Sequence, residues 1–247
     1  MANSIIRIND LKRNFIVGSE TVRALRGVSF EIQAGEFVAI MGTSGSGKST
    51  MLNILGCLDK PTSGEYYIDE IEVSKFSNDK LSEIRNKKIG FVFQSYNLLP
   101  RTAAIEQVEL PLLYNPSVGA KERRERAEEA LRLVGLEERM YHLPSQMSGG
   151  QQQRVAIARA IVNDPVIILA DEATGNLDTR TSYEIMSLFQ RLNESGKTIA
   201  FVTHEPDIAA FTSRVVMLRD GRVTKDEPVK TASAQAALDA LPASDDY

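Results

Sequence analysis

The hydrophobic residues of this chain are concentrated in short runs separated by longer, mixed segments. Several runs are apolar at almost every position and rich in Val and Ile, as expected for strands that are covered on both faces. The predicted strands are residues 4–8, 28–32, 37–41, 89–93, 166–170 and 198–203. Helical periodicity is seen between them, at residues 47–58, 121–135 and 182–195. This alternation predicts an α/β fold with a mostly parallel, layered sheet.

Two regions depart from the alternating pattern. The stretch "VVMLRDGRV" (215–223) has two β-type runs around Asp220–Gly221, which predicts an antiparallel hairpin. Residues 105–134 have a helical pattern only, which predicts a helical subdomain inserted into the sheet at approximately residues 100–160. The tail after Val223 alternates Ala with polar residues and predicts a peripheral helix followed by a frayed end at "PASDDY".

Composition limits the class of protein. The chain has 247 residues and a net charge of −4 with both signs interspersed, which argues against a nucleic-acid-binding protein. A single cysteine, Cys57, excludes an internal disulfide and is most simply a small buried residue in a reducing compartment. No apolar run approaches the roughly 18 residues that span a bilayer, and the first residues lack the apolar core of a signal peptide. We therefore expect no direct membrane span.

The clearest motif is a phosphate loop of the pattern G-x4-G-K-[ST], between a predicted strand and a predicted helix. Its residues are Gly42, Thr43, Ser44, Gly45, Ser46, Gly47, Lys48, Ser49 and Thr50. Glycines allow the backbone to wrap around phosphates with its N–H groups pointing inward. Lys48 is expected to reach the β and γ phosphates of ATP, and the Ser49 hydroxyl to bind Mg²⁺. The motif alone predicts only that the protein binds a nucleoside triphosphate.

Two adjacent acids, Asp171 and Glu172, end the apolar run "VIILADE". Burying an ionised carboxylate there is costly unless a cation or a donor compensates for it. The ends of parallel strands are also where α/β sheets bind ligands. Asp171 is therefore a candidate metal-site residue that supports Mg²⁺ through the ion's own ligands, and Glu172 is a candidate base that orients water at the γ phosphate. The alternative is a carboxylate that caps a helix.

A second element has the features of an anion cradle. Ser148, Gly149, Gly150 and Gln151 precede a predicted helix, whose first N–H groups and positive dipole end favour an anion. We call these four residues the signature segment. A chain with one complete phosphate loop has no evident use for a second cradle.

The order of these elements resembles the ATPase domain of ABC transporters over roughly residues 5–223. The phosphate loop, Gln94, "MSGGQQQR", "ILADE", "GNLD" and His204 occur in the order of that family. The resemblance implies a P-loop NTPase fold, with a mostly parallel core sheet, an antiparallel β subdomain and the inserted helical subdomain. It also implies an ATPase domain at residues 1–224 and a peripheral helix and tail at residues 225–247.

The resemblance assigns further roles position by position. It implies that Gln94 contacts Mg²⁺ and the attacking water, that His204 contacts the γ phosphate, and that Asp178 shapes a dimer contact. Phe15 falls where the family places an aromatic that stacks on adenine, although a core aromatic is the alternative reading. Two departures are visible, because Met147 stands in the usual Leu position and Ala173 replaces the usual Pro. Both acids remain, and the change from Leu to Met nearly conserves volume.

The resemblance also explains the second cradle. In this family two subunits pack head to tail, so that each ATP lies between the phosphate loop of one and the signature segment of the other. The implied partners are therefore ATP, Mg²⁺, a second copy of the chain and a separate transmembrane permease. The implied location is the cytoplasmic face of the inner membrane. The segment "QSYNLLPR" is a candidate docking surface for the permease, or alternatively part of the core of the helical subdomain.

Segments such as "TVRALRGVSFEI" and "FVFQSYNLLP" resemble those of one branch of the family. This branch contains the ATPases of macrolide exporters, lipoprotein-release complexes, bacitracin-type resistance transporters and cell-division regulators. This implies a Mg²⁺-dependent ATPase that drives the export or extraction of a peptide, lipoprotein or drug. The alternative is a cell-division type regulator, which transmits a mechanical signal and moves no solute. ABC ATPases of translation or DNA repair fit poorly, because the chain has neither a duplicated domain nor a coiled-coil insertion.

Overall fold

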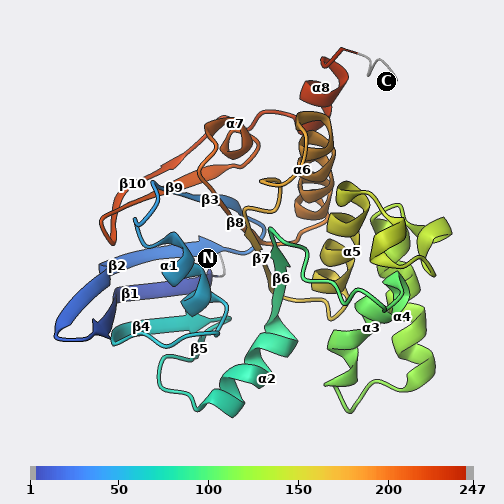
Figure 1. Cartoon of the computed structure of the whole chain (residues 1–247). Coiled ribbons are helices and arrows are strands. Elements are labelled where there is room, and N and C mark those ends of the chain that lie inside the picture. Colours follow the sequence, from blue (N-terminus) through green and yellow to red (C-terminus); the bar gives the residue numbers. More distant parts are fainter. Residues whose placement is uncertain (1–3, 243–247) are drawn as a thin grey trace.

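The strands and helices alternate as the apolar runs predict, and the computed structural model describes residues 4–242 (Figure 1). The strands are β1 (Ser4–Val17), β2 (Glu20–Gln33), β3 (Phe37–Met41), β4 (Ser63–Ile68), β5 (Ile71–Glu72), β6 (Ile89–Phe93), β7 (Ile167–Asp171), β8 (Ile199–Thr203), β9 (Arg214–Arg219) and β10 (Arg222–Pro228). The helices are α1 (Lys48–Leu55), α2 (Asn78–Lys88), α3 (Ala104–Leu113), α4 (Ala120–Leu133), α5 (Gly149–Ile161), α6 (Thr179–Glu194), α7 (Pro206–Ala209) and α8 (Ala234–Asp239).

The strands of the described residues form two sheets. A six-stranded sheet has the order β10-β9-β3-β8-β7-β6, and its strands are parallel except for the antiparallel β9–β10 pair. A four-stranded antiparallel sheet has the order β2-β1-β4-β5. The predicted α/β class, with a mostly parallel sheet and an additional antiparallel sheet, is confirmed. The predicted hairpin at Asp220–Gly221 is the β9–β10 turn.

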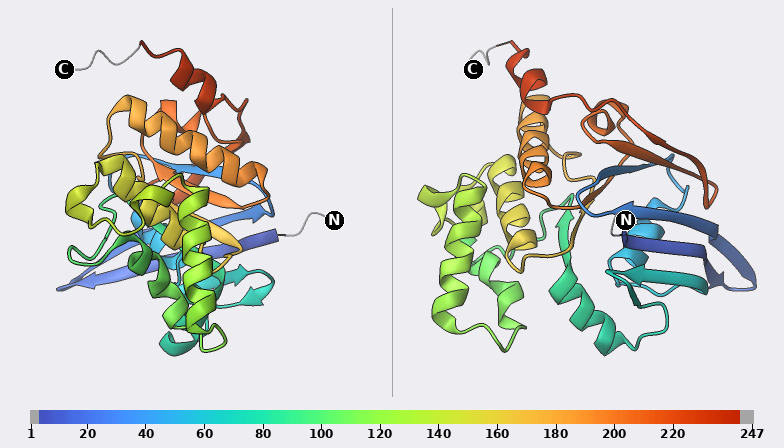
Figure 2. Two further views of the ribbon diagram at one scale, coloured as in Figure 1. Left: turned by 90° about the vertical axis from the view of Figure 1, so that its right-hand side faces the viewer. Right: turned by 180° about the vertical axis from the view of Figure 1, so that it is seen from behind.

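Both faces of the inner strands β3, β7 and β8 are buried, and this explains why these strands are apolar at successive positions. In β8, Ile199 and Phe201 belong to a core shared with α5 and α6, whereas Ala200 and Val202 belong to a core shared with α1 and the antiparallel sheet. Side chains alternate between the faces of a strand, so a strand buried on both faces needs an unbroken apolar run. Figure 2 shows the antiparallel sheet and helices α3–α5 on opposite sides of the six-stranded sheet.

Helices α3, α4 and α5 lie between β6 and β7 in the chain and correspond to the predicted helical insertion. Two short 3-10 turns, at Glu137–Arg139 and Pro144–Gln146, separate α4 from α5. Most of α4 is solvated, with only Ala127, Ala130 and Leu131 buried, and its outer face carries the Arg126–Glu122 pair. Within residues 4–242, no helix combines the length and the apolar character that crossing a membrane requires.

The structure corrects the sequence prediction in three places. Strands β1 and β2 are 14 residues each, much longer than the predicted runs, because they pair along a bulged hairpin. Strand β10 continues to Pro228 rather than ending near residue 224, since it stays paired with β9 as far as Arg214. Elements β4, β5 and α2 were not predicted; in α2 only Leu81 and Ile84 are buried, which is too few for a periodic signal. The predicted peripheral helix is α8, and most of the predicted frayed end lies outside the described residues.

We expect Phe201→Ala to destabilise the protein by about 3–5 kcal/mol, the usual cost of truncating a buried aromatic. Phe201 is fully buried, with its ring centroid 5.5 Å from that of Phe189 and 6.4 Å from that of Phe37. Urea unfolding followed by circular dichroism measures the loss. The control is Leu133→Ala, because Leu133 is 56% exposed and its truncation should change stability little. Equal effects of the two substitutions would contradict this placement of the core.

Candidate functional site

The phosphate loop is held in shape by glycines that pack against neighbouring backbone. Gly42 and Gly47 have φ values of 156° and 106°, a region that residues with side chains rarely adopt. A Cβ atom at Gly42 would lie 2.3 Å from the carbonyl oxygen of Leu218, and one at Gly47 would lie 2.8 Å from that of Ala24. The loop therefore fits between β2 and β9 only without these side chains.

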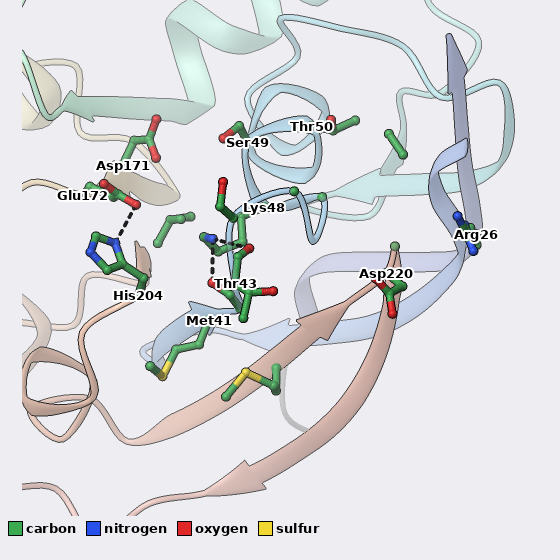
Figure 3. Close-up of a pocket in the computed structure, with 18 of the residues that line it drawn as sticks. Arg26, Met41, Thr43, Lys48, Ser49, Thr50, Asp171, Glu172, His204 and Asp220 are labelled. Atoms are coloured by element: carbon green, nitrogen blue, oxygen red, sulfur yellow. Dashed lines mark hydrogen bonds and ion pairs between the residues drawn. The ribbon is translucent and has the colours of Figure 1, made fainter. Parts of the chain in front are cut away.

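A large cleft, which we call the phosphate-loop cleft, opens above this loop and has a volume of about 1280 Å³. Most of the predicted nucleotide and metal residues line it, and Figure 3 shows Lys48, Ser49, Asp171, Glu172 and His204 among them. The predicted residues that line this cleft are Gly42, Thr43, Ser44, Gly45, Gly47, Lys48, Ser49, Thr50, Gln94, Asp171, Glu172 and His204. Residues far apart in sequence are thus brought together by the ends of β3, β6, β7 and β8.

Lys48 folds back over its own loop. Its ammonium group donates hydrogen bonds to the carbonyl oxygens of Gly42 at 2.6 Å and Thr43 at 3.1 Å (Figure 3). The charge is therefore held above the wrapped backbone, where α1 begins at Lys48 with Gly47 as its N-cap. A positive charge and the first N–H groups of a helix at one point form a site for an anion such as phosphate.

The carboxyl groups of Asp171 and Glu172 have different surroundings although the two residues are adjacent. Partial burial raises the pKa of Asp171 above its ordinary value; the charge of Glu172 raises it further, and Lys48 opposes the shift. Glu172 has a φ of 45°, a left-handed conformation that costs a residue with a side chain about 1–3 kcal/mol. Its Oε1 lies 3.0 Å from Nδ1 of His204. The left-handed turn therefore directs the Glu172 carboxylate toward His204 rather than along the strand.

The oxygen groups at this end of the sheet fit a magnesium ion. Ser49, Gln94 and Asp171 would provide hydroxyl, amide and carboxylate oxygens, and all three line the phosphate-loop cleft. Mg²⁺ prefers oxygen ligands and usually takes one or two carboxylates together with phosphate oxygens and water. The raised pKa of Asp171 marks negative charge that the neighbouring residues do not fully compensate. A bound cation would relieve this excess charge.

Gln94 is anchored to the segment that follows the acids. Its side-chain amide donates to Asn176 Oδ1 at 3.3 Å, and the side chain of Asn176 donates to the Gln94 carbonyl at 3.1 Å. A Cβ at Gly175 would lie only 2.8 Å from Nε2 of Gln94. Gln94 is thus in contact with the chain between Glu172 and α6, as well as with the cleft.

The signature segment lies in a different cleft, which we call the signature cleft and which has a volume of about 540 Å³. Ser148, Gly150 and Gln151 line it, together with Arg154, and none of the residues that line it also lines the phosphate-loop cleft. Ser148 is the N-cap of α5: its hydroxyl accepts a hydrogen bond from Gln151 N, and Gln151 Oε1 accepts one from Ser148 N. The structure therefore separates the two predicted cradles.

Other predicted residues lie outside both clefts. Ser46 is a buried residue of the phosphate loop, and Gly149 lies at the start of α5 without lining the signature cleft. Asp178 caps α6 through hydrogen bonds from Thr181, which lower the pKa of Asp178. Phe15 is 36% exposed, which excludes the core-aromatic alternative. Its strand partner Val22 lines the phosphate-loop cleft, although Phe15 itself does not.

Several residues that border the phosphate-loop cleft were missed from the sequence. They come from β2 and from the β9–β10 hairpin, and include Thr21, Val22, Arg26, Asp220 and Gly221. Gly221 N donates to the Ser46 carbonyl at 3.0 Å, and Arg26 N donates to the Gly221 carbonyl at 2.7 Å. The one available signal was the Asp220–Gly221 turn, which predicts a hairpin but not its docking on the phosphate loop.

Comparison with known proteins gives one consistent result. The family model described as ABC transporter matches residues 25–175. An uncharacterized ABC transporter ATP-binding protein of Thermotoga maritima is 57% identical over 219 residues, which are 89% of this chain and 93% of that protein. The macrolide export ATP-binding/permease protein MacB of Chlorobium phaeobacteroides is 50% identical over 243 residues, which are 96% of this chain and 37% of that protein.

A solved structure agrees over most of the chain. The dimeric, post-hydrolysis structure of the ATP-binding cassette MJ0796 of Methanocaldococcus jannaschii, bound to ADP and Pi, has a TM-score of 0.83 and 49% identity. The match covers 92% of this chain and all of that one. The fold described above is therefore similar to that of a nucleotide-binding cassette.

The raised pKa of Asp171 predicts that Asp171→Asn stabilises the protein in the absence of nucleotide at pH 7. A raised carboxyl pKa means that folding favours the protonated acid, so this stability is present below the ordinary aspartate pKa and is lost as pH rises through the raised value. The substitution removes the cost of the charge, and a rise in Tm of about 2–4 °C corresponds to roughly 1 kcal/mol in a chain of this size. Thermal unfolding at pH 7 and near pH 4 measures the gain, which should shrink at the lower pH.

Asp178→Ala is the matched contrast, because the pKa of Asp178 is lowered rather than raised. Its stabilising effect is present above the ordinary aspartate pKa and is lost as pH falls through the lowered value. We expect a loss of about 1 kcal/mol at pH 7, the usual cost of removing an N-cap. A loss of stability in Asp171→Asn similar to that in Asp178→Ala would show that the charge of Asp171 is compensated in the folded protein.

Proposed function

This chain belongs to the ABC transporter family of ATP-binding proteins, and on that premise we propose that two copies pack head to tail around two molecules of ATP. Each ATP lies in a composite site, formed by the phosphate-loop cleft of one copy and the signature segment of the other. Hydrolysis of ATP at these two sites, with Mg²⁺, drives a separate membrane permease at the cytoplasmic face of the membrane. The similarity to macrolide export proteins supports export as the process that is driven. We propose a peptide, a lipoprotein or a drug as the molecule that is exported or extracted. The permease is a separate chain in this proposal.

The observation that carries the proposal is the separation of the two anion cradles. The phosphate-loop cleft and the signature cleft have no lining residue in common, so the signature segment of one chain has no evident access to a nucleotide on its own phosphate loop. A second copy, related by a two-fold axis, brings each signature segment to the other's nucleotide. The dimeric structure of MJ0796, bound to ADP and Pi, is consistent with this arrangement.

Each residue of the composite site has a specific task in this proposal. Lys48 and the start of α1 hold the β and γ phosphates, while Ser49, Asp171 and Gln94 hold Mg²⁺. Magnesium would neutralise charge that develops on the phosphate oxygens. The Glu172 carboxylate accepts a proton from the attacking water, and His204, 3.0 Å away, holds that carboxylate and contacts the γ phosphate. The partner's Ser148 and the start of its α5 stabilise the remaining negative charge.

A groove of about 960 Å³ beside Gln94 is the proposed docking site for the permease, and we call it the docking groove. Its walls carry Phe91 and Phe93, whose rings stack with centroids 5.0 Å apart, together with half-exposed Leu58 and Leu99. Arg85, Lys87, Arg159 and Glu83 give the groove a net positive charge. This chemistry fits an apolar helical segment of the permease that carries an acidic residue.

We expect Glu172→Gln to lower kcat for ATP hydrolysis by about 100-fold or more, the usual contribution of a general base. Because the amide keeps the shape of the carboxylate, ATP binding should remain, and ATP should now hold the dimer together. Phosphate release, and gel filtration with and without ATP, measure the two effects. The control is Glu194→Gln, since Glu194 is an exposed carboxylate at the end of α6. Near-normal hydrolysis in Glu172→Gln would contradict the catalytic role.

Ser148→Arg tests whether the signature segment acts on the partner's nucleotide. We expect labelled ATP to bind almost normally, because the phosphate-loop cleft is intact, while hydrolysis falls about 100-fold with the loss of the stabilising helix start. Ser145→Arg is the control, because it makes the same change three residues earlier at an exposed position outside both clefts. Loss of ATP binding in Ser148→Arg would contradict an action across the dimer. In the unmodified protein, specific activity should rise with protein concentration.

A further inference from the structure

Arg159 carries a partly buried charge that borders the docking groove but takes no part in holding ATP or Mg²⁺. It lies near the end of α5, eleven residues after Ser148. Burial lowers the pKa of the Arg159 guanidinium below its ordinary value. Its two hydrogen bonds among the described residues go to backbone carbonyls, those of Asn97 at 2.6 Å and Tyr96 at 2.7 Å. A partly buried guanidinium whose hydrogen bonds go only to neutral carbonyls is incompletely compensated, so the role of the two carbonyls calls for an explanation.

The two carbonyls belong to a strained turn. Tyr96 and Asn97 have φ values of 57° and 50°, so two successive residues with side chains are left-handed. Each such residue costs roughly 1–2 kcal/mol, somewhat less for Asn. A turn of this kind persists only where its surroundings hold it, and such turns are concentrated in switch regions. The fork of the Arg159 guanidinium matches the two successive carbonyl groups and holds the turn.

The same turn contacts both ends of α5. Arg159 is near the helix end, whereas the Tyr96 hydroxyl reaches its start, where a Cβ at Gly149 would lie 2.9 Å from Tyr96 Oη. Two residues before Tyr96, Gln94 is bonded to Asn176 and lines the phosphate-loop cleft. The loop that carries Gln94 is thereby connected to the helix that begins with the signature segment.

We propose that Arg159 is a positioning residue that locks the turn at residues 96–97 onto α5, so that Gln94 of one site and Ser148 of the other move together. Arg159, Asn97 and Leu99 also line the docking groove. A permease segment in that groove would displace the turn. The hydrogen bonds between Arg159 and the turn would then pass the displacement through α5 to its start. This inference rests on the proposed function and identifies one contact through which the partner acts on the composite site.

The first test compares Arg159→Gln with the unmodified protein in the absence of permease. We expect kcat to fall about 10- to 100-fold, because a small misplacement of the signature segment is enough for such a loss. KM for ATP should change little, since Arg159 does not line the phosphate-loop cleft. The control is Arg123→Gln, because Arg123 of α4 also donates to a backbone carbonyl, that of Val118 at 2.9 Å, but lies outside both clefts and the groove.

A fluorescent reporter tests the movement itself. The chain has no Trp, so Leu99→Trp introduces a single tryptophan beside the turn at a position that is 50% exposed. In the Glu172→Gln background, ATP should change the emission of this tryptophan as the dimer closes. Adding Arg159→Gln should abolish that change while labelled ATP still binds. An unchanged emission response in the Arg159→Gln protein would overturn the proposal.

Arg159→Lys separates the fork from the charge and serves if Arg159→Gln fails to fold. Lysine keeps the charge but lacks the planar fork that bridges two carbonyls, so we expect less than half of the lost turnover to return. Full turnover in Arg159→Lys, or normal turnover in Arg159→Gln, would overturn the proposal and leave the ATPase function standing. An unmodified protein without ATP-dependent dimers or hydrolysis would instead overturn the proposed function.

Discussion

The site depends on how closely the backbone of the phosphate loop is packed. A side chain at Gly42 would collide with the carbonyl of Leu218, and one at Gly47 with that of Ala24. The loop is therefore shaped by β9 and β2 as much as by its own sequence. The hydrogen bond from Gly221 N to the Ser46 carbonyl closes this frame. Within this frame, Lys48 and the start of α1 place a positive charge and N–H groups at one point, where an anion can bind.

The acidic end of β7, by contrast, lowers the stability of the folded protein. Asp171 is kept partly buried beside another carboxylate, and Glu172 occupies a left-handed conformation. Neither feature helps the chain to fold, and both place carboxylate oxygens where a cation and a polarised water would sit. Local rules are broken here and obeyed in the surrounding strands, which is the pattern expected where function competes with stability.

The sequence predicted the parts of the molecule that local pattern determines. Strands buried on both faces, such as β7 and β8, are unbroken apolar runs, and the phosphate loop and acid pair are contiguous motifs. Contacts between distant segments leave no such signal. Val22 and Asp220 border the cleft only because β2 and the β9–β10 hairpin dock on the loop. Helix α2 was not predicted because two buried residues give no helical periodicity. The role of Arg159 was not predicted because its hydrogen-bond acceptors are backbone carbonyls, which every residue has.

Because the phosphate-loop cleft and the signature cleft are separate, the arrangement of residues within one chain has a consequence for how two chains assemble. A nucleotide held only by the phosphate loop has one face open to solvent, and water there keeps the dielectric high and the electrostatic contribution small. In the proposed dimer, a second chain covers this face, excludes water and adds the start of its own α5, so that catalysis depends on dimerisation. The start of α5 must then be positioned by residues that line neither of the two clefts. In this chain the connection runs from Gln94 through the strained turn at residues 96–97 to Arg159, and it borders the groove in which a membrane partner would bind.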